Sequence, residues 1–188
     1  MRISAAILIV TVAMASHAMG KGPLVIGSFA NRAVNGWAYS NGKEFPGAQG
    51  NMAIVKALDT ASGFAAYLEG AFGKGGGYVA FGRKLAKPLP FKRLSFKIKT
   101  QDYDSIKLRL IDGSGQIHQQ TIDLKDDEDW QDINVEKASG KGYVFWGGAK
   151  DAKWHDPLTG ITLMLSKNSL KPGLKVGKAY FAEIKLYQ

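Results

Sequence analysis

The sequence of 188 residues contains no cysteine and three histidines. The absence of cysteine excludes disulfide bonds, thiol nucleophiles and zinc–thiolate sites. Because His17 falls in the apolar N-terminal segment, only His118 and His155 remain, which argues against a histidine-rich metal site. A domain with this composition must be stabilised by the packing of its hydrophobic core.

Several motifs of catalysis and ion binding are absent as well. The sequence has no Gly-x-Ser-x-Gly nucleophile elbow. Its glycine-rich piece "GKGGG" does not match a phosphate loop, because Lys74 is not followed by Ser or Thr at the start of a helix. The acidic run "KDDEDW" lacks the central glycine and the distal glutamate of an EF-hand loop, so an exposed turn is expected there.

A glycosidase would need two carboxylates about 5–10 Å apart across a cleft. Four acidic residues are candidates: Glu44, Glu69, Asp151 and Asp156. Nothing in the sequence brings two of them together. We therefore expect a protein without catalytic activity, and a glycan-active hydrolase or lyase remains as an alternative.

The N-terminus has the pattern of a secretory signal peptide. Arg2 precedes a short apolar run, which ends at the small residues Ser16 and Ala18. Residues 1–20 are assigned to a signal peptide and residues 21–188 to a single β-sandwich domain. The apolar run is shorter than the ~20 residues that a transmembrane helix needs, although an uncleaved anchor stays open. These features predict a periplasmic or secreted protein with no membrane insertion after cleavage.

The formal net charge of +9 bears on the kind of partner. A basic exported domain can meet nucleic acid, the anionic cell envelope or an acidic polysaccharide. The export signal argues against nucleic acid, and so do the scattered lysines, which match no nucleic-acid-binding motif. In the simplest interpretation, most of the charge comes from solvated lysines on the outer faces of strands.

Short alternating segments between clusters of Gly, Pro, Asn and Asp predict an all-β protein. In "RLSFKIKT" and "SIKLRLID" every second residue is apolar, so one face of each strand is expected to be buried. The turn "DGSG" then joins "SIKLRLID" to "QIHQQTIDL" as a hairpin. Further strands are expected in "PLVIGSFA", "WQDINVEK", "GITLMLSK" and "AYFAEIKLY".

Two more segments, "FAAYLEGAF" and "GYVAFGRKL", are expected to pair as a hairpin around the glycine-rich loop. The segment "AIVKALDT" has some helical character but is too short to predict a helix. With eight to ten strands and no convincing amphipathic helix, the chain is expected to form a two-sheet antiparallel jelly-roll sandwich.

The stretch "YVFWGGAKDAKWHDPLTG" holds the densest group of chemically able side chains. Its aromatic rings suit the C–H-rich faces of sugars, and its charged side chains suit sugar hydroxyls. The predicted ligand-binding residues are Tyr143, Trp146, Lys150, Asp151, Trp154, His155 and Asp156. For Phe145 and Trp146 the alternative is packing in the core or at its rim, and for residues 154–156 it is loop architecture.

Three motifs occur in a fixed order: "GKEFPGAQG", "GGGYVAFGRKL" and "WGGAKDAKWHDPLTGITLML", with "LRLIDGSGQIHQQ" between the last two. The set resembles the galactose-binding-domain-like β-sandwich modules found beside bacterial glycoside hydrolases, and it is similar to carbohydrate-binding modules. The resemblance covers nearly the whole chain after the signal peptide.

The resemblance implies a galactose-binding-domain-like jelly roll that binds polysaccharide without cleaving it. It also implies a structural calcium near the chain ends, held by acids in a late strand. In "FAEIKL", Ala182 and Glu183 stand where two aspartates would be expected, so Glu183 is the one metal-ligand candidate.

The leading interpretation is a periplasmic or secreted, non-catalytic carbohydrate-binding protein. Its expected partner is a polysaccharide or oligosaccharide, acidic ones included. A structural or protein-interaction module of the cell envelope is the alternative, because a sandwich also offers a docking face. Binding to a free glycan separates the two interpretations.

Overall fold

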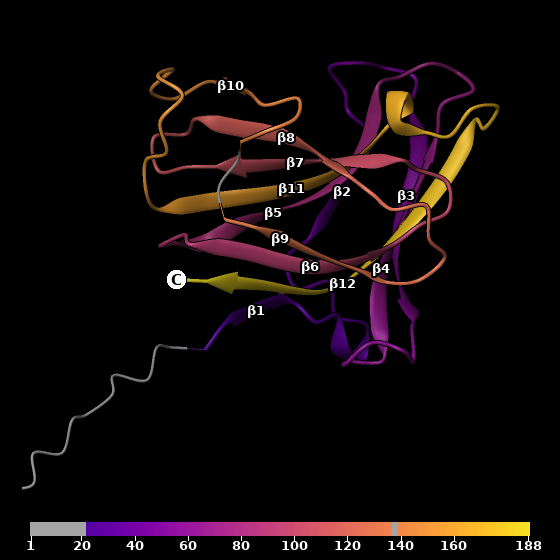
Figure 1. Ribbon diagram of the computed structural model, residues 1–188, viewed down its shortest axis with the longest axis horizontal. Helices are drawn as coiled ribbons and strands as arrows, with labels where there is room; N and C mark the ends of the chain where they lie inside the picture. Colours follow the sequence, from indigo (N-terminus) through magenta and orange to yellow (C-terminus); the bar gives the residue numbers. More distant parts are fainter. Residues whose placement is uncertain (1–21, 137–138) are drawn as a thin grey trace, which may run out of the picture.

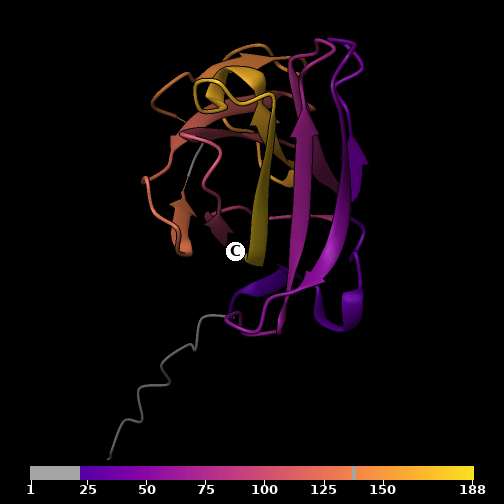
Figure 2. The same ribbon diagram turned by 90° about the vertical axis from the view of Figure 1, so that its right-hand side faces the viewer.

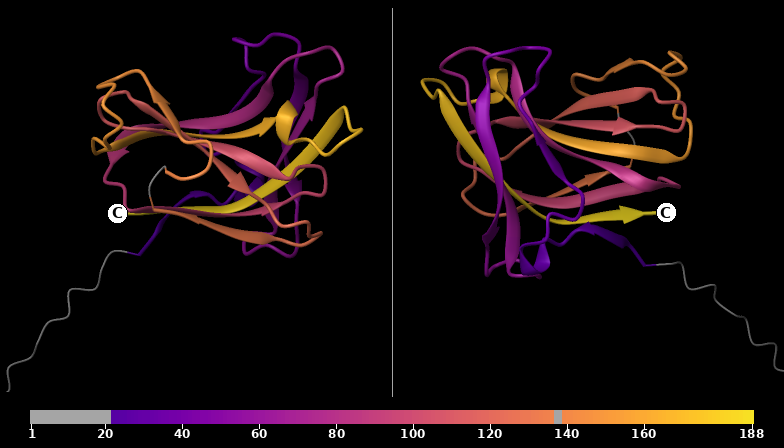
Figure 3. Two further views of the ribbon diagram at one scale, coloured as in Figure 1. Left: turned by 45° about the horizontal axis from the view of Figure 1, so that its top comes forward. Right: turned by 180° about the vertical axis from the view of Figure 1, so that it is seen from behind.

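The computed structural model describes residues 22–136 and 139–188. The predicted signal peptide, residues 1–20, lies outside this part of the chain. The described residues fold into two antiparallel sheets that lie one above the other as layers (Figure 3, left). The predicted fold class, an all-β sandwich of two antiparallel sheets, is therefore confirmed.

We name the two sheets after one strand of each. The β12 sheet has the order β3-β4-β12-β6-β9, and β1 pairs with the end of β12. Its strands are β1 (Leu24–Gly27), β3 (Gln49–Lys56), β4 (Phe64–Ala71), β6 (Arg93–Lys99), β9 (Gln131–Val135) and β12 (Val176–Tyr187). The first half of β12 pairs with β4 and the second half with β6, so β3 and β4 stand steeply to β6 and β9 (Figure 1 and Figure 2).

The β11 sheet has the order β10-β8-β7-β11-β5-β2. Its strands are β2 (Ala38–Ser40), β5 (Tyr78–Leu89), β7 (Ser105–Ile111), β8 (Ile117–Asp123), β10 (Val144–Trp146) and β11 (Leu158–Ser166). Two short 3-10 helices, η1 (Ala30–Arg32) and η2 (Lys167–Ser169), connect strands. Among the described residues, no helix has the length and apolar character that crossing a membrane requires.

The alternation of the sequence decides which side chains fill the core. Strand β7 buries Ile106, Leu108 and Leu110 between the sheets, while Lys107 and Arg109 point to the outer face. Strand β6 alternates in the same way, and β7 pairs with β8 as the predicted hairpin. The predicted strands and their hairpin are therefore confirmed. Their register is strongly fixed, because a slip of one residue would move every apolar side chain to the solvent face.

Aromatic side chains join the two sheets across the core. The ring centroid of Phe181 on β12 lies 4.9 Å from that of Phe81 on β5 and 6.3 Å from that of Phe96 on β6. Trp37 packs on Phe81 at 4.8 Å, and its indole N–H donates to the carbonyl of Ile26. These contacts hold the two layers together in a chain that has no disulfide.

The predicted hairpin of "FAAYLEGAF" and "GYVAFGRKL" is wrong. These segments are β4 and β5, which lie in different sheets, because β4 pairs with β3 and β12 while β5 pairs with β11 and β2. The glycine-rich loop between them crosses from one sheet to the other. At Gly76, whose φ is 85°, a β-carbon would come within 2.1 Å of the Ala48 amide nitrogen, so only glycine permits this crossing.

Nor is the segment "AIVKALDT" helical. Its first four residues form the end of β3, which pairs along its whole length with β4. The β-branched side chains of Ile54 and Val55 suit a strand that lies beside another strand. Tertiary pairing therefore decides this segment, and its local pattern does not.

The substitution Phe181→Ala should destabilise the fold by about 3–5 kcal/mol, because it removes a fully buried ring that touches both sheets. Urea denaturation measures this loss as a drop in the free energy of unfolding. The matched control is Tyr180→Ala, at the neighbouring, half-buried position on the outer face of β12. If both variants lose the same stability, Phe181 does not join the layers as described.

Candidate functional site

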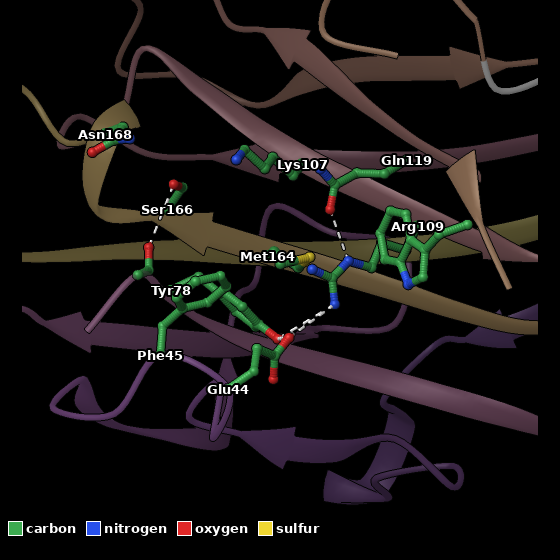
Figure 4. A pocket seen from close by; sticks show the side chains of 11 residues that line it. Glu44, Phe45, Tyr78, Lys107, Arg109, Gln119, Met164, Ser166 and Asn168 are labelled. Carbon is green, nitrogen blue, oxygen red and sulfur yellow. Dashed lines mark hydrogen bonds and ion pairs between the residues drawn. The ribbon is translucent and has the colours of Figure 1, made fainter. Parts of the chain in front are cut away.

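The outer face of the β11 sheet carries an open cleft of about 580 Å³ (Figure 4). Ala80 of β5 and Met164 of β11 point to this outer face, yet each is only 1% exposed, because the surrounding side chains rise above them. The lining residues are Glu44, Phe45, Gly77, Tyr78, Lys107, Arg109, Gln119, Trp146, Met164, Ser166 and Asn168. They come from five strands of the β11 sheet, from the 3-10 helix η2 and from two loops.

Aromatic rings form opposite walls of the cleft. Trp146 stands on the edge strand β10 and is 38% exposed. Tyr78 begins β5, and Phe45 approaches it edge-on from the β2–β3 loop, with 6.4 Å between the ring centroids. Gly42, with a φ of 62°, lets this loop pass Tyr78, because a β-carbon there would lie 2.9 Å from the Tyr78 carbonyl oxygen.

Arg109 lies between the aromatic walls. Its guanidinium carbon is 5.0 Å from the ring centroid of Tyr78 and 5.1 Å from that of Trp146, within the range of cation–π attraction. Its Nε donates to Oε1 of Gln119 at 2.8 Å. Its Nη1 donates to the Tyr78 hydroxyl at 3.3 Å and lies 3.6 Å from Oε1 of Glu44 (Figure 4). The guanidinium is thus fixed in place before any ligand arrives.

Glu44 is the acidic member of this group. The Tyr78 hydroxyl donates to Oε1 of Glu44. This hydrogen bond, the backbone amide of Glu44 and the charge of Arg109 together lower the pKa of Glu44 below its ordinary value. Burial, and next the same hydrogen bond, raise the pKa of Tyr78. At neutral pH the cleft therefore contains a carboxylate, a guanidinium and a neutral phenol.

The same outer face continues into a second hollow of about 430 Å³, whose floor includes Gly82 and Gly160. On β11, Ser166, Met164 and Thr162 lead from the first hollow to Gly160 in the second. At ~3.3 Å per residue, this path is ~20 Å long. The face is therefore long enough to hold several units of a linear polymer.

One of the seven predicted ligand-binding residues, Trp146, lines the cleft. The other six lie before β10 or in the long loop after it: Tyr143, Lys150, Asp151, Trp154, His155 and Asp156. The structure thus brings Trp146 together with Tyr78 and Arg109, and it gives the other six different neighbours.

Trp154 packs against the edge of the core. Its ring lies 5.1 Å from that of Phe91 and 5.2 Å from that of His118, and its indole N–H donates to Oδ1 of Asp156 at 2.8 Å. The same carboxylate oxygen accepts the backbone N–H of Phe91. Loop architecture thus occupies Trp154 and Asp156, and their ligand-binding role stays a prediction.

The remaining loop residues are exposed or bonded to each other. The imidazole of His155 lies 3.1 Å from the carboxylate of Asp151. The backbone N–H of Lys153 and then His155 lower the pKa of Asp151. Lys150 is exposed, with a positive φ of 56°. A ligand role for these residues also stays a prediction.

A buried polar chain supports the strand that carries Trp146. Asp112 and His118 are fully buried, with Oδ2 of Asp112 3.1 Å from Nε2 of His118. Nδ1 of His118 lies 2.9 Å from the hydroxyl of Tyr143, the residue before β10. Burial alone would raise the pKa of Asp112, but hydrogen bonds from His118, Ser114 and two backbone amides outweigh it and lower that pKa.

The β7–β8 turn also holds the loop after β10. The Ser114 hydroxyl accepts the N–H of Ala149 at 3.2 Å. The Gln116 amide accepts from the N–H of Asp151 at 3.0 Å and donates to the carbonyl of Lys153 at 2.9 Å. The loop after β10, residues 147–157, therefore supports β10 and holds Trp146 at the edge of the β11 sheet.

Sequence reasoning singled out neither Tyr78 nor Arg109 as a ligand-binding residue, and Glu44 only as a candidate for catalysis. Each lies in a motif that carried the family resemblance, but the motifs meet only through the pairing of β2 with β5 and of β11 with β5 and β7. One local signal was present: Lys107 and Arg109 occupy the polar positions of the alternating strand "SIKLRLID", on the face away from the core.

Glu183, the predicted metal ligand, is held by contacts within the protein. Calcium takes 6–8 oxygen ligands. Here Oε1 of Glu183 accepts the N–H of Ala61 at 3.2 Å, and Oε2 lies 3.1 Å from the ammonium of Lys185. In residues 22–136 and 139–188 no three His, Cys, Asp or Glu side chains are grouped closely enough to hold a metal. Glu183 instead forms an ion pair inside the bulge of β12.

Solved structures share this fold at low sequence identity. The family 11 carbohydrate-binding module of the cellulosomal cellulase Lic26A-Cel5E of Clostridium thermocellum matches with a TM-score of 0.64 at 18% identity, over 88% of this chain and 94% of that chain. The family 11 module from Clostridium thermocellum in complex with a β-1,3-1,4-mixed-linked tetrasaccharide matches with a TM-score of 0.61 at 19% identity, over the same shares.

A family 61 module in complex with β-1,4-galactotriose matches with a TM-score of 0.50 at 13% identity, over 86% of this chain and 91% of that chain. An exo-β-agarase matches with a TM-score of 0.56 at 12% identity, but this chain covers only 25% of it. No protein-family model matches the chain, and no curated protein sequence matches it. The chain thus has the β-sandwich fold of carbohydrate-binding modules, as the sequence motifs indicated.

The substitution Asp112→Ala should lower the free energy of unfolding by about 1–3 kcal/mol at neutral pH, because it leaves several buried donors unpaired. The pKa of Asp112 is lowered by folding, so its contribution is present at neutral pH and is lost as the pH falls below about 4. Urea denaturation at about pH 7 and about pH 3 measures the difference between wild type and variant. A difference that does not shrink in acid would contradict the role given to Asp112, and Asp132→Ala at an exposed site is the control.

Calcium should have no effect on the thermal stability of the protein, because Lys185 already neutralises Glu183. We expect the same midpoint of thermal unfolding in EDTA and in excess calcium. Lys185→Met should lower that midpoint, since it leaves the Glu183 carboxylate, which is 14% exposed, without its partner. A rise of the wild-type midpoint on addition of calcium would overturn this account of Glu183.

Proposed function

We propose that the chain is an exported, non-catalytic protein that binds an oligosaccharide or polysaccharide in the cleft on the outer face of the β11 sheet. One observation carries the proposal: Tyr78 and Trp146 flank a fixed, hydrogen-bonded Arg109 in an open cleft. Aromatic faces beside convergent polar groups suit a sugar ring, which has apolar C–H faces and a rim of hydroxyls.

The polar groups of the cleft suit sugar hydroxyls. Glu44 and the Gln119 carbonyl oxygen accept hydrogen bonds, while Lys107, Ser166 and Asn168 carry donors. All of them line the same cleft as the apolar side chain of Met164. Because Lys107, Gln119 and Ser166 stand on paired strands, their backbone is already ordered when a ligand is bound.

The open shape of the outer face supports a polymeric ligand. The second hollow extends the cleft along β11 and β5 for ~20 Å, so a polysaccharide chain can continue past the aromatic walls. The neighbours of the same fold include modules solved with a mixed-linked tetrasaccharide and with a galactotriose. Oligosaccharides are therefore the first ligands to test.

The single carboxylate of the cleft supports binding without cleavage. Glycoside hydrolysis needs two carboxyl groups across the scissile bond. Of the residues that line the cleft, Glu44 alone carries a carboxylate, and it is engaged by Tyr78 and Arg109. The other three candidates do not line the cleft: Glu69 accepts a hydrogen bond from the Tyr67 hydroxyl, and Asp151 and Asp156 lie in the loop after β10.

Export is proposed from the sequence. Arg2 and the apolar run that follows it have the pattern of a cleaved signal peptide, which would deliver the domain to the periplasm or the medium. Both compartments contain polysaccharide, and a fold without cysteine needs no disulfide formation there.

The substitution Trp146→Ala should weaken glycan binding at least about tenfold, a loss of ~1.4 kcal/mol, because it removes one wall of the cleft. Affinity electrophoresis and calorimetry against mixed-linked β-glucan and β-1,4-galactan provide the first measurement. Trp130→Ala is the matched control, since Trp130 donates to Asp59 away from the cleft. Equal binding by wild type and Trp146→Ala would rule out the cleft, and failure of the wild type to bind any glycan in a broad panel would rule out the function.

A further inference from the structure

We infer that the cleft selects anionic glycans, in which a carboxylate or sulfate group of the sugar is bound by Lys107 and Arg109. The inference rests on the proposed function and adds the chemical class of the ligand. It arises from the positive charge on the outer face of the β11 sheet. Stacking of a sugar on the aromatic walls does not require this charge.

Basic side chains dominate this face. The two hollows contain Lys84, Lys107 and Arg109 on β5 and β7, against the single acid Glu44. Arg83 also lines the second hollow, but its guanidinium donates to the carbonyl of Ile26. These side chains leave the two hollows with more positive than negative charge.

Arg109 presents an unoccupied edge. Gln119 accepts from its Nε, while Tyr78 accepts from its Nη1 and Glu44 lies beside that atom. Its Nη2 has no hydrogen-bond partner among the residues that the structure describes. The side chain is 19% exposed, so a ligand can reach it from the cleft. A guanidinium fixed in this way binds an anionic oxygen without first having to be ordered.

Lys107 supplies a second cation on the same strand. It lies two residues before Arg109, so its side chain faces the same side, with the two α-carbons ~7 Å apart. Its ammonium pairs with no acidic side chain of residues 22–136 and 139–188. An anionic group between the two would interact with both charges in a partly desolvated cleft, where such attraction is stronger than in water.

Glu44 opposes the binding of an anionic group in the cleft. Its carboxylate offsets part of the Arg109 charge from the opposite wall of the cleft. A neutral sugar would meet Glu44 as a hydrogen-bond acceptor, whereas an anionic sugar would be repelled by it. Lys107 and Glu44 should therefore have opposite effects on the preference for an anionic ligand.

The test compares glycans that differ only in charge. Calorimetry measures the affinity of the protein for oligogalacturonate and for its methyl ester, and for a sulfated galactan and its desulfated form. We expect the charged member of at least one pair to bind about tenfold more tightly, the effect of one charge-assisted hydrogen bond. The pair that shows the preference identifies carboxylate or sulfate as the group that is bound.

Three variants locate the preference. Lys107→Gln should lower the ratio of charged to uncharged affinity, and Glu44→Gln should raise it. Lys97→Gln, the same change of charge on the outer face of the β12 sheet, should leave the ratio unchanged. Equal effects of Lys107→Gln and Lys97→Gln would reduce the preference to net charge and overturn the inference.

Two further outcomes separate the inference from the function. If the neutral member of each pair, or a neutral β-glucan, binds as tightly as any charged glycan and Trp146→Ala abolishes that binding, the cleft binds carbohydrate but does not select anions. If no glycan of either charge binds, the proposed function falls together with the inference.

Discussion

The two-residue period of strand β7 is the constraint on which both the core and the cleft depend. Leu108 and Leu110 enter the core from one face of the strand, and Lys107 and Arg109 enter the cleft from the other. A slip of one residue would bury two cations and expose the apolar side chains. The hydrophobic burial that stabilises the sandwich therefore also fixes the position of Arg109.

The other parts of the cleft are positioned by their pairing to this strand. Strand β11 pairs with β7 and β5, which sets Met164 and Tyr78 beside Arg109, and β8 on the opposite side carries Gln119. Trp146 depends on a weaker element, the three-residue edge strand β10. The buried Asp112 and the loop that the β7–β8 turn holds provide the support that so short a strand lacks.

Local patterns predicted the fold class but only part of the candidate site. Alternation identified β6 and β7, since it reports directly on a buried face. It could not show that β4 and β5 belong to different sheets, because pairing is decided by contacts distant in sequence. The density of aromatic and charged residues in "YVFWGGAKDAKWHDPLTG" likewise pointed to Trp154, but the contacts that occupy its ring come from residues distant in sequence. Trp146 lies in the cleft, while Tyr78 and Arg109 reach it from distant segments that look like ordinary strands.

The most direct test of the central claim is to locate the bound glycan by nuclear magnetic resonance. Titration of the labelled protein with the tightest-binding oligosaccharide should shift the backbone amides of β5, β7, β8 and β11 around Arg109, together with the indole N–H of Trp146. Shifts confined to the outer face of the β12 sheet, or to the loop around Trp154 and His155, would contradict the account.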